Sequence, residues 1–425
     1  MLLRCYPKIT DWVYFFFNQS PSADYRFLPL YSYGFFVAVG FFAAATLTVA
    51  ELKRREALGL LKGVELQITE GGAPMVSELL FYFLFGFIIF FKITGIFVFH
   101  ELLRTKQLGF STYLLANSEG NLIQKILSVF TYGSYVGGMI GGLALSFYYY
   151  YSRNKEKLSE IITKKIMIYP SDSIGDLLII ALVLGVLGSN LFNFLENPEE
   201  YKNFWADPVG SIFSGLSIYG GLICAGIGFW IYARWKKFNL THFFDSVAPG
   251  FILANGIGRL GCQTAGDGDW GITNLHPKPD WIPQFLWSSH YEHNIVDYDP
   301  GSFIQGCTED HCHFLANAAY PTPLYEFLMC TAIFFILWAL RKRLTGKPGM
   351  IFTVFMILIG IQRYSIEQWR DLSGRDLYHV FGFALRQSEL ISIVLFLAGI
   401  AGTVYLYTRS RYKKTEPASH VDSPS

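Results

Sequence analysis

About nine apolar stretches divide this chain, and each is long enough, or nearly so, to cross a bilayer as a helix of about 20 residues. Hydrophobic residues make up 52% of the 425 residues and charged residues 16%, against about 25% charged in a typical soluble domain. The stretches cover 33–50, 78–99, 132–151, 174–193, 214–233, 244–261, 323–340, 349–367 and 388–408. The sequence therefore predicts an all-α polytopic membrane protein, a bundle of about nine transmembrane helices.

Lysine and arginine follow every odd-numbered stretch, for example at 53–55 and 341–343. Such clusters mark the cytoplasmic ends of membrane helices. We therefore expect the N-terminus outside and the C-terminus in the cytoplasm. The start of the chain lacks the basic, apolar and small-residue pattern of a signal peptide, so we expect no cleavage there. The net charge of +1 gives no indication of a nucleic-acid partner.

A glycine-rich stretch surrounds one arginine where the sixth span ends, at 256–271, and glycine occurs there at 256, 258, 261, 266, 268 and 271. Glycine lets a backbone approach a ligand closely. Arg259, with Asp267 and Asp269 nearby, has the chemistry to hold an anionic headgroup through paired hydrogen bonds. The alternative is a glycine-rich loop whose arginine merely extends to the membrane surface.

Ionisable residues also mark the seventh and eighth spans. Arg363, Glu367 and Arg370 are spaced i, i+4 and i+7, which places them on one helical face. Charged groups at membrane depth usually face a cavity or one another. These residues either line a functional pocket or form an internal ion pair, Arg363 with Glu367, that only joins helices. Glu326 begins the seventh span and needs a partner.

Under the predicted orientation, these polar residues gather on the outer side at one depth, together with tyrosines that begin the first and fifth spans. We therefore predict an outward-facing polar pocket within the bundle. Its members are Tyr33, Tyr219, Arg259, Asp267, Glu326, Arg363 and Glu367.

The order of these motifs resembles that of the prolipoprotein diacylglyceryl transferase family. The matching segments are Tyr33-Gly34, Asp176 to Glu196, Gly220-Gly221-Leu222, Gly258-Arg259-Leu260-Gly261, Leu324-Tyr325-Glu326, Arg363 with Glu367 and Arg370, and Ser388 to Ser392. The resemblance implies a multi-pass enzyme of the bacterial cytoplasmic membrane. Its partners would be phosphatidylglycerol, the signal peptides of prolipoproteins and the bilayer. The implied reaction moves a diacylglyceryl group onto the lipobox cysteine, forms a thioether and releases glycerol phosphate.

The resemblance also implies residue roles, without any metal or cofactor. The catalytic candidates are Arg259, Arg363, Tyr219 and Glu367, and the substrate-binding candidates are Tyr33, Gly258, Gly261, Cys262, Gln263, Asp267, Asp269, Glu326 and Arg370. The two arginines would stabilise charge on the leaving phosphate. The group that accepts the thiol proton stays open among Tyr219, Glu367, Glu326 and Asp267. Cys262 would line the pocket, because the reacting thiol arrives with the substrate.

Several departures indicate a divergent member of the family. Tyr219 stands where the family has its signature histidine, Asn190 where an arginine is common, and Cys262 where an asparagine is usual. Two extra spans and a long outer loop, 271–320, are unusual. The expected segments are 1–50, outer arm and first helix; 51–76, cytoplasmic loop; 77–151, inserted two-span segment; 152–262, core helices; 263–320, extracytoplasmic loop; 321–410, core helices; and 411–425, disordered cytoplasmic tail.

Two rival functions remain open at this point. A lipid-binding paralogue that does not catalyse the reaction would explain Tyr219 and Asn190. A secondary transporter would explain charges at membrane depth, although transporter sites usually lie near the midplane between repeats. In the outer loop, Cys307 and Cys312 are open to three interpretations, namely a disulfide, free thiols, or a metal site with nearby histidines.

Overall fold

The computed structural model describes residues 5–9, 12, 31–70, 76–99, 132–155, 162–196, 217–296, 302–307, 311–370, 378–380 and 383–415. The chain forms two compact units. The first comprises residues 1–20, 30–62 and 238–425, and the second comprises 21–29 and 63–237. Each unit is described separately below.

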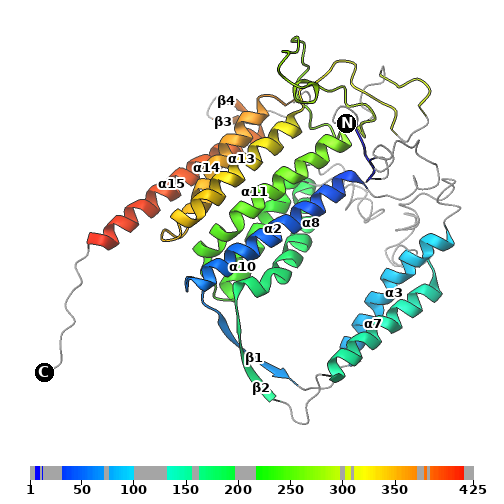
Figure 1. The fold of residues 1–425 in the computed structure, drawn as a ribbon, viewed down its shortest axis with the longest axis vertical. Coiled ribbons are helices and arrows are strands. Elements are labelled where there is room, and N and C mark those ends of the chain that lie inside the picture. The colour runs from blue at the N-terminus through cyan, green and yellow to red at the C-terminus, as the bar shows by residue number, and fades with distance from the viewer. Residues whose placement is uncertain are drawn as a thin grey trace. The chain divides into compact units, whose positions relative to one another are not determined.

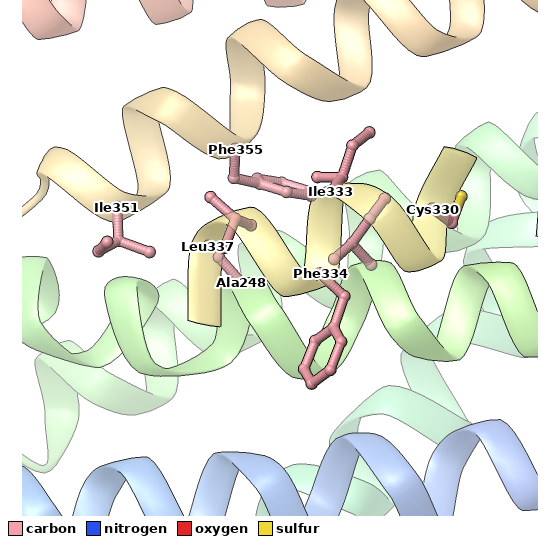
Figure 2. Packing of buried hydrophobic residues seen from close by; sticks show 8 residues of the cluster. Ala248, Cys330, Ile333, Phe334, Leu337, Ile351 and Phe355 are labelled. Atoms are coloured by element: carbon pink, nitrogen blue, oxygen red, sulfur yellow. The ribbon is translucent and has the colours of Figure 1, made fainter. Parts of the chain in front are cut away.

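Five long helices build the first unit (Figure 1). They are α2 (Ser32–Ala57), α11 (Leu240–Ala265), α13 (Thr322–Arg343), α14 (Met350–Glu367) and α15 (Gln387–Thr415). Helix α11 packs against α2, α13 and α14, and α15 packs against α14. Apolar side chains of α11, α13 and α14 form the core of this unit, including Ala248, Leu337, Ile351 and Phe355 (Figure 2).

Local sequence explains where these helices begin and end. Helix α13 carries a proline in its first turn, where the fixed φ suits a helix and no amide hydrogen bond is lost. Helix α11 ends at Gly266, whose φ of 65° is left-handed and whose amide donates to the Cys262 carbonyl at 2.9 Å. Glycine adopts that conformation without a Cβ clash. The sharp end of α11 places the following residues beside its last turn.

Close packing joins α2 to α11. A Cβ atom on Gly250 would lie 2.8 Å from the Ala44 carbonyl oxygen, so only glycine allows this approach of the two backbones. Small residues at such contacts are typical of membrane helices, where packing replaces the hydrophobic driving force.

A buried polar cluster joins the end of α2 to the starts of α11 and α14. It lies at the other end of α11 from Arg259. Arg55, fully enclosed, lies 3.0 Å from Glu51 and 3.3 Å from Asp245. Asp245 also accepts the amides of Gly349 and Phe352 at 2.8 and 2.9 Å, and so caps the start of α14. Arg55 belongs to a basic cluster that we interpreted only as an orientation signal, yet its guanidinium lies inside the fold.

The second unit contains four long helices and a two-stranded sheet. The helices are α3 (Val76–Val98), α7 (Tyr135–Lys155), α8 (Ile174–Glu196), preceded by the 3-10 turn η2 (Pro170–Ser173), and α10 (Ile218–Trp235). Helix α3 packs against α7, and α8 packs against α10. A Cβ on Gly221 would lie 2.9 Å from the Gly185 carbonyl oxygen, so the backbones of α8 and α10 approach closely there. The Tyr232 hydroxyl donates to Asp176 at 2.5 Å and links the two helices.

Two small antiparallel sheets accompany the helices, and one of their strands lies within the segment 51–76 that we expected to be a loop. Strand β1 (Val64–Glu70) pairs antiparallel with β2 (Ile162–Ile168), and β3 (Tyr378–Val380) pairs with β4 (Phe383–Leu385). In β1, apolar residues alternate at Val64, Leu66 and Ile68, which is the period of a strand. The chain is therefore mostly helical with two small sheets. Helix α15 also continues to Thr415, into the tail that we expected to be disordered from 411.

Each of the nine predicted spans overlaps one of the long helices described above. Six helical segments within the described residues are long and apolar enough to cross a membrane: Ser32–Ala57, Val76–Val98, Pro170–Leu195, Thr322–Arg343, Met350–Glu367 and Gln387–Arg409. The chain is thus a helical, multi-pass membrane protein. The total of nine spans and their orientation stay predictions.

Candidate functional site

Six charged side chains of alternating sign form a closed ring at one end of the first unit. We call Arg259, Glu326, Arg363, Glu367, Arg370 and Asp269 the charge ring. Successive contacts are Arg259 Nε to Glu326 Oε2 at 2.8 Å, Glu326 Oε1 to Arg363 Nη1 at 2.7 Å, Arg363 Nη2 to Glu367 Oε2 at 3.3 Å, Glu367 Oε2 to Arg370 Nη1 at 3.8 Å, Arg370 Nη2 to Asp269 Oδ1, and Asp269 Oδ2 to Arg259 Nη1 at 2.5 Å.

The helix directions bring these residues together. Arg259 lies near the end of α11, Glu326 in the first turns of α13, and Arg363 and Glu367 near the end of α14. Because α14 returns antiparallel to α13 after a short connection, its end meets the start of α13. Arg370 and Asp269 follow α14 and α11, and the main chains of Gly271 and Arg370 pair in a β-bridge.

Burial makes the ring a costly arrangement unless its charges are paired. The Glu367 and Glu326 side chains are only 1% and 3% exposed, and Arg259 is 11% exposed. Removing charges from water costs several kcal/mol per ion unless close partners compensate. Three cations alternate with three anions, so the ring is formally neutral. Glu326 is central, because its two oxygens accept from Arg259 and Arg363.

Arg259 keeps unused donor capacity. Its Nε and Nη1 atoms contact Glu326 and Asp269, and Nη1 also lies 3.9 Å from the Cys262 sulfur. Within the described part of the chain, its Nη2 atom has no hydrogen-bond partner. An arginine fixed on one edge by carboxylates and open at another is suited to bind a phosphate.

Asp267 lies beside the ring without joining it. The described residues give it no ion pair, whereas its Oδ1 accepts the Asp269 amide at 3.3 Å. Burial raises the pKa of the Asp267 carboxyl above its usual range, and the Cys262 thiol and Arg259 lower it only in part. Among the acidic groups of this site, Asp267 is therefore the one that the described arginines leave outside their ion pairs.

Cys262, Asp267 and Asp269 bring potential ligand atoms within 4.8 Å of one another. This is the one group of metal-binding type among the residues the structure describes. Asp269 is already paired with Arg259 and Arg370, and two guanidinium groups beside a cation would repel it. The arrangement therefore favours an anion over a metal ion.

The predicted substrate-binding residues of α11 have different surroundings. A Cβ on Gly261 would lie 3.1 Å from the Tyr33 Cα, so α2 crosses closely there. A Cβ on Gly258 would meet nothing within 4 Å, so packing does not require a glycine at this position. Gln263 is buried and accepts the Tyr291 hydroxyl at 3.0 Å.

One predicted member of the pocket belongs to the second unit. Tyr219 belongs to α10 in the second unit, and its side chain lies outside the described part of the chain. Its predicted convergence with Arg259 stays a prediction.

Sequence reasoning missed two groups next to the ring. Gln362 lies 3.4 Å from Glu326 Oε1, and the Thr322 hydroxyl donates to the Asp269 carbonyl at 2.7 Å. Gln362 directly precedes Arg363 in α14, and a buried glutamine in an apolar helix is the signal that could have revealed it.

The outer loop contains the disulfide that was one of three interpretations of its cysteines. Cys307 and Cys312 are bonded, and the His293 Nδ1 atom lies 4.0 Å from the Cys307 sulfur. The disulfide interpretation is therefore confirmed, and these two cysteines are not metal ligands.

Comparison with known proteins identifies the family. The family model described as prolipoprotein diacylglyceryl transferase matches residues 157–405, more than half of the chain. The chain belongs to this family. The matched part includes all six members of the charge ring. Helices α2, α3 and α7 precede the match.

Curated relatives carry the name of an enzyme. A phosphatidylglycerol–prolipoprotein diacylglyceryl transferase of Corynebacterium efficiens is 29% identical over 251 residues, 58% of this chain and 72% of that protein. One from Streptococcus uberis is 29% identical over 244 residues, 57% of this chain and 81% of that protein. One from Clostridium tetani is 27% identical over 261 residues, 58% of this chain and 84% of that protein. The family assignment thus makes this chain a membrane transferase of lipoprotein biosynthesis.

Proposed function

We propose that this protein transfers the diacylglyceryl group of phosphatidylglycerol to the lipobox cysteine of prolipoproteins in the bacterial inner membrane. A thioether forms and glycerol phosphate is released. The names of the related enzymes support these substrates. The single observation that carries the proposal for this site is the charge ring, in which Glu326 holds Arg259 and Arg363 side by side.

In the proposed reaction, the thiol sulfur attacks the glycerol carbon that bears the phosphate. The sulfur–carbon bond forms, the carbon–oxygen bond breaks, and its electron pair stays on the phosphate oxygen. Negative charge therefore grows on the leaving group. Preorganised cationic donors stabilise such charge because they need not reorient during the reaction. Arg259 and Arg363 supply these donors, and we assign Nη2 of Arg259 to the phosphate.

The thiol proton needs an acceptor, since the thiolate is the nucleophile. We assign this role to Asp267. Glu326 and Glu367 are engaged by arginines at 2.7–3.3 Å, so their oxygens are already occupied by ion pairs. Asp267 lacks such a partner in the described residues, and burial raises its pKa. Cys262 would line the site beside Asp267. It is not needed as a nucleophile, because the reacting thiol belongs to the substrate.

A lipid-binding paralogue without catalysis is the second candidate, favoured by tyrosine at position 219 and asparagine at 190. One experiment separates the two. Purified protein in phosphatidylglycerol vesicles receives a lipobox peptide with cysteine or, as a matched control, with serine. Glycerol phosphate release that requires the cysteine peptide supports the transferase. Lipid binding without release supports the paralogue.

A further inference from the structure

The predicted outer loop, which joins α11 to α13, packs together with Cys5 around a small hydrophobic core. We call Cys5, Trp270, Tyr291 and Ala319 the outer-loop core; each is at most 6% exposed. The Trp270 and Tyr291 ring centroids are 5.2 Å apart. The segment is therefore a packed structure beside the charge ring, and its interior residues are fixed in place.

This core is continuous with one member of the ring. Trp270 directly follows Asp269, which contacts Arg259 and Arg370. On one side the Asp269 carbonyl accepts the Thr322 hydroxyl, and on the other the Gly271 amide donates to the Tyr320 carbonyl at 2.8 Å. The packing of Trp270 and these two hydrogen bonds therefore fix the main chain that carries the Asp269 carboxylate.

The turn that carries Tyr291 is strained. Tyr291 and His293 have φ values of 47° and 62°, a left-handed conformation that costs a non-glycine residue about 1–3 kcal/mol. Three hydrogen bonds hold the turn: Tyr291 N to Ser289 Oγ at 3.1 Å, Asn294 Nδ2 to the Tyr291 carbonyl at 3.1 Å, and His293 N to the His313 carbonyl at 2.8 Å. Strain of this kind persists only where the surroundings impose it, and here it directs the Tyr291 ring inward.

The Tyr291 hydroxyl reaches the helix that carries Arg259. It donates to Gln263 Oε1 at 3.0 Å, and both side chains are buried. Gln263 lies four residues after Arg259, on the same face of α11. Burial raises the pKa of Tyr291 well above its usual value, so the hydroxyl stays protonated and remains a donor at neutral pH. The Ile295 amide adds a bond to the Gly266 carbonyl at 3.2 Å.

We propose that Tyr291 is a positioning residue for diacylglyceryl transfer. Its ring packs against Trp270, which follows Asp269, and its hydroxyl holds Gln263 in the last turn of α11, so two independent contacts support the orientation of Arg259. The inference rests on the proposed function and extends the catalytic machinery into the outer loop, which sequence reasoning treated only as an insertion.

Tyr291→Phe tests the hydroxyl while it keeps the ring. Trp287→Phe is the matched control, because it removes one aromatic donor of the same loop, the bond from Trp287 Nε1 to the His276 carbonyl at 3.2 Å. We expect Tyr291→Phe to lower kcat about three- to tenfold, the equivalent of one hydrogen bond. KM for phosphatidylglycerol should stay unchanged, because the arginine still binds lipid but is less well oriented. The control should leave kcat unchanged.

A double-mutant cycle with Gln263→Leu shows whether the hydroxyl acts through Gln263. Non-additivity is expected: the double variant should be no slower than the slower single variant. Equal kcat losses in Tyr291→Phe and Trp287→Phe, or losses that multiply in the cycle, would overturn the proposal, since both indicate a general structural role.

A second measurement separates failure of this inference from failure of the proposed function. If the wild type makes no thioether, the function is wrong, and amide hydrogen exchange then decides the positioning role alone. Tyr291→Phe should accelerate exchange at 264–271 more than Trp287→Phe does, with α14 unchanged. Equal exchange in the two variants would overturn the inference.

Discussion

The Nε atom of Arg259 lies 2.8 Å from Glu326 Oε2, and the other oxygen of Glu326 lies 2.7 Å from Arg363 Nη1. One carboxylate thus holds the two arginines that the proposed reaction needs for its leaving phosphate. The contact joins α11, α13 and α14, so the fold of the first unit and the geometry of its site depend on the same buried ion pairs.

Removing the guanidinium of Arg259 should slow transfer strongly. We expect Arg259→Ala to lower kcat/KM about 100- to 1000-fold, as for a lost oxyanion donor. Arg259→Lys should recover little, because an ammonium cannot span Glu326, Asp269 and a phosphate at once. Arg343→Ala, at an exposed arginine of α13, is the control. Normal turnover in Arg259→Ala would show that the site is elsewhere.

Glu326→Gln should destabilise the protein as well as slow it. The change keeps the shape of the side chain but leaves Arg259 and Arg363 without their shared anion, and breaking a buried pair costs about 3–5 kcal/mol. Thermal unfolding in detergent measures this. Glu65→Gln is the matched control, because that carboxylate is 51% exposed and pairs with Lys165 on the surface. Equal unfolding temperatures for the two variants would contradict a structural role for Glu326.

Much of the charge ring could be predicted from sequence. The i, i+4, i+7 spacing of Arg363, Glu367 and Arg370 is local, and the lysine and arginine pattern predicted which ends of the helices meet. The pairing of Asp269 with Arg370 could not be predicted, because these two residues meet only through the fold of the segment that follows α11. Sequence left open whether the Arg363–Glu367 pair only joins helices; the structure shows the pair as one link of the charge ring, and its functional role stays a prediction.

Other features could not be predicted for similar reasons. The burial of Arg55 depends on Glu51 and Asp245 meeting across two helices, whereas the sequence signal counts charges only. Strand β1 has an alternating pattern, whereas β2 has polar residues at 163–165 and apolar residues at 166–168. A strand also needs a partner, and β2 lies far along the chain from β1. The role of Tyr291 depends on a left-handed turn that its own sequence does not favour.

Asp267→Asn should change the pH dependence of transfer. A raised pKa means that the wild-type carboxylate is lost as pH falls through a value above the usual aspartate pKa of about 3.9. We expect kcat/KM to fall on that acid limb, and Asp267→Asn to be slower with the limb absent. An unchanged acid limb would assign the proton acceptor to another group.

The same group gives a stability prediction of defined sign. Between the usual and the raised pKa, the folded protein holds a proton that the unfolded chain has released. The free energy of unfolding contributed by Asp267 therefore rises as pH falls through this window. Unfolding at several pH values should show this rise in the wild type and not in Asp267→Asn.

Cys262→Ser should retain turnover, because the reacting thiol belongs to the substrate. Product formation by this variant, followed over many turnovers, checks the prediction. Complete loss of activity with normal folding would indicate instead that Cys262 forms a covalent intermediate.

The most direct test of the central claim is mass spectrometry of a lipobox-cysteine peptide after incubation with the purified protein and phosphatidylglycerol. We predict a mass gain of one diacylglyceryl group on the cysteine, absent with Arg259→Ala. A peptide of unchanged mass, with phosphatidylglycerol still bound to correctly folded wild-type protein, would contradict the proposed transfer.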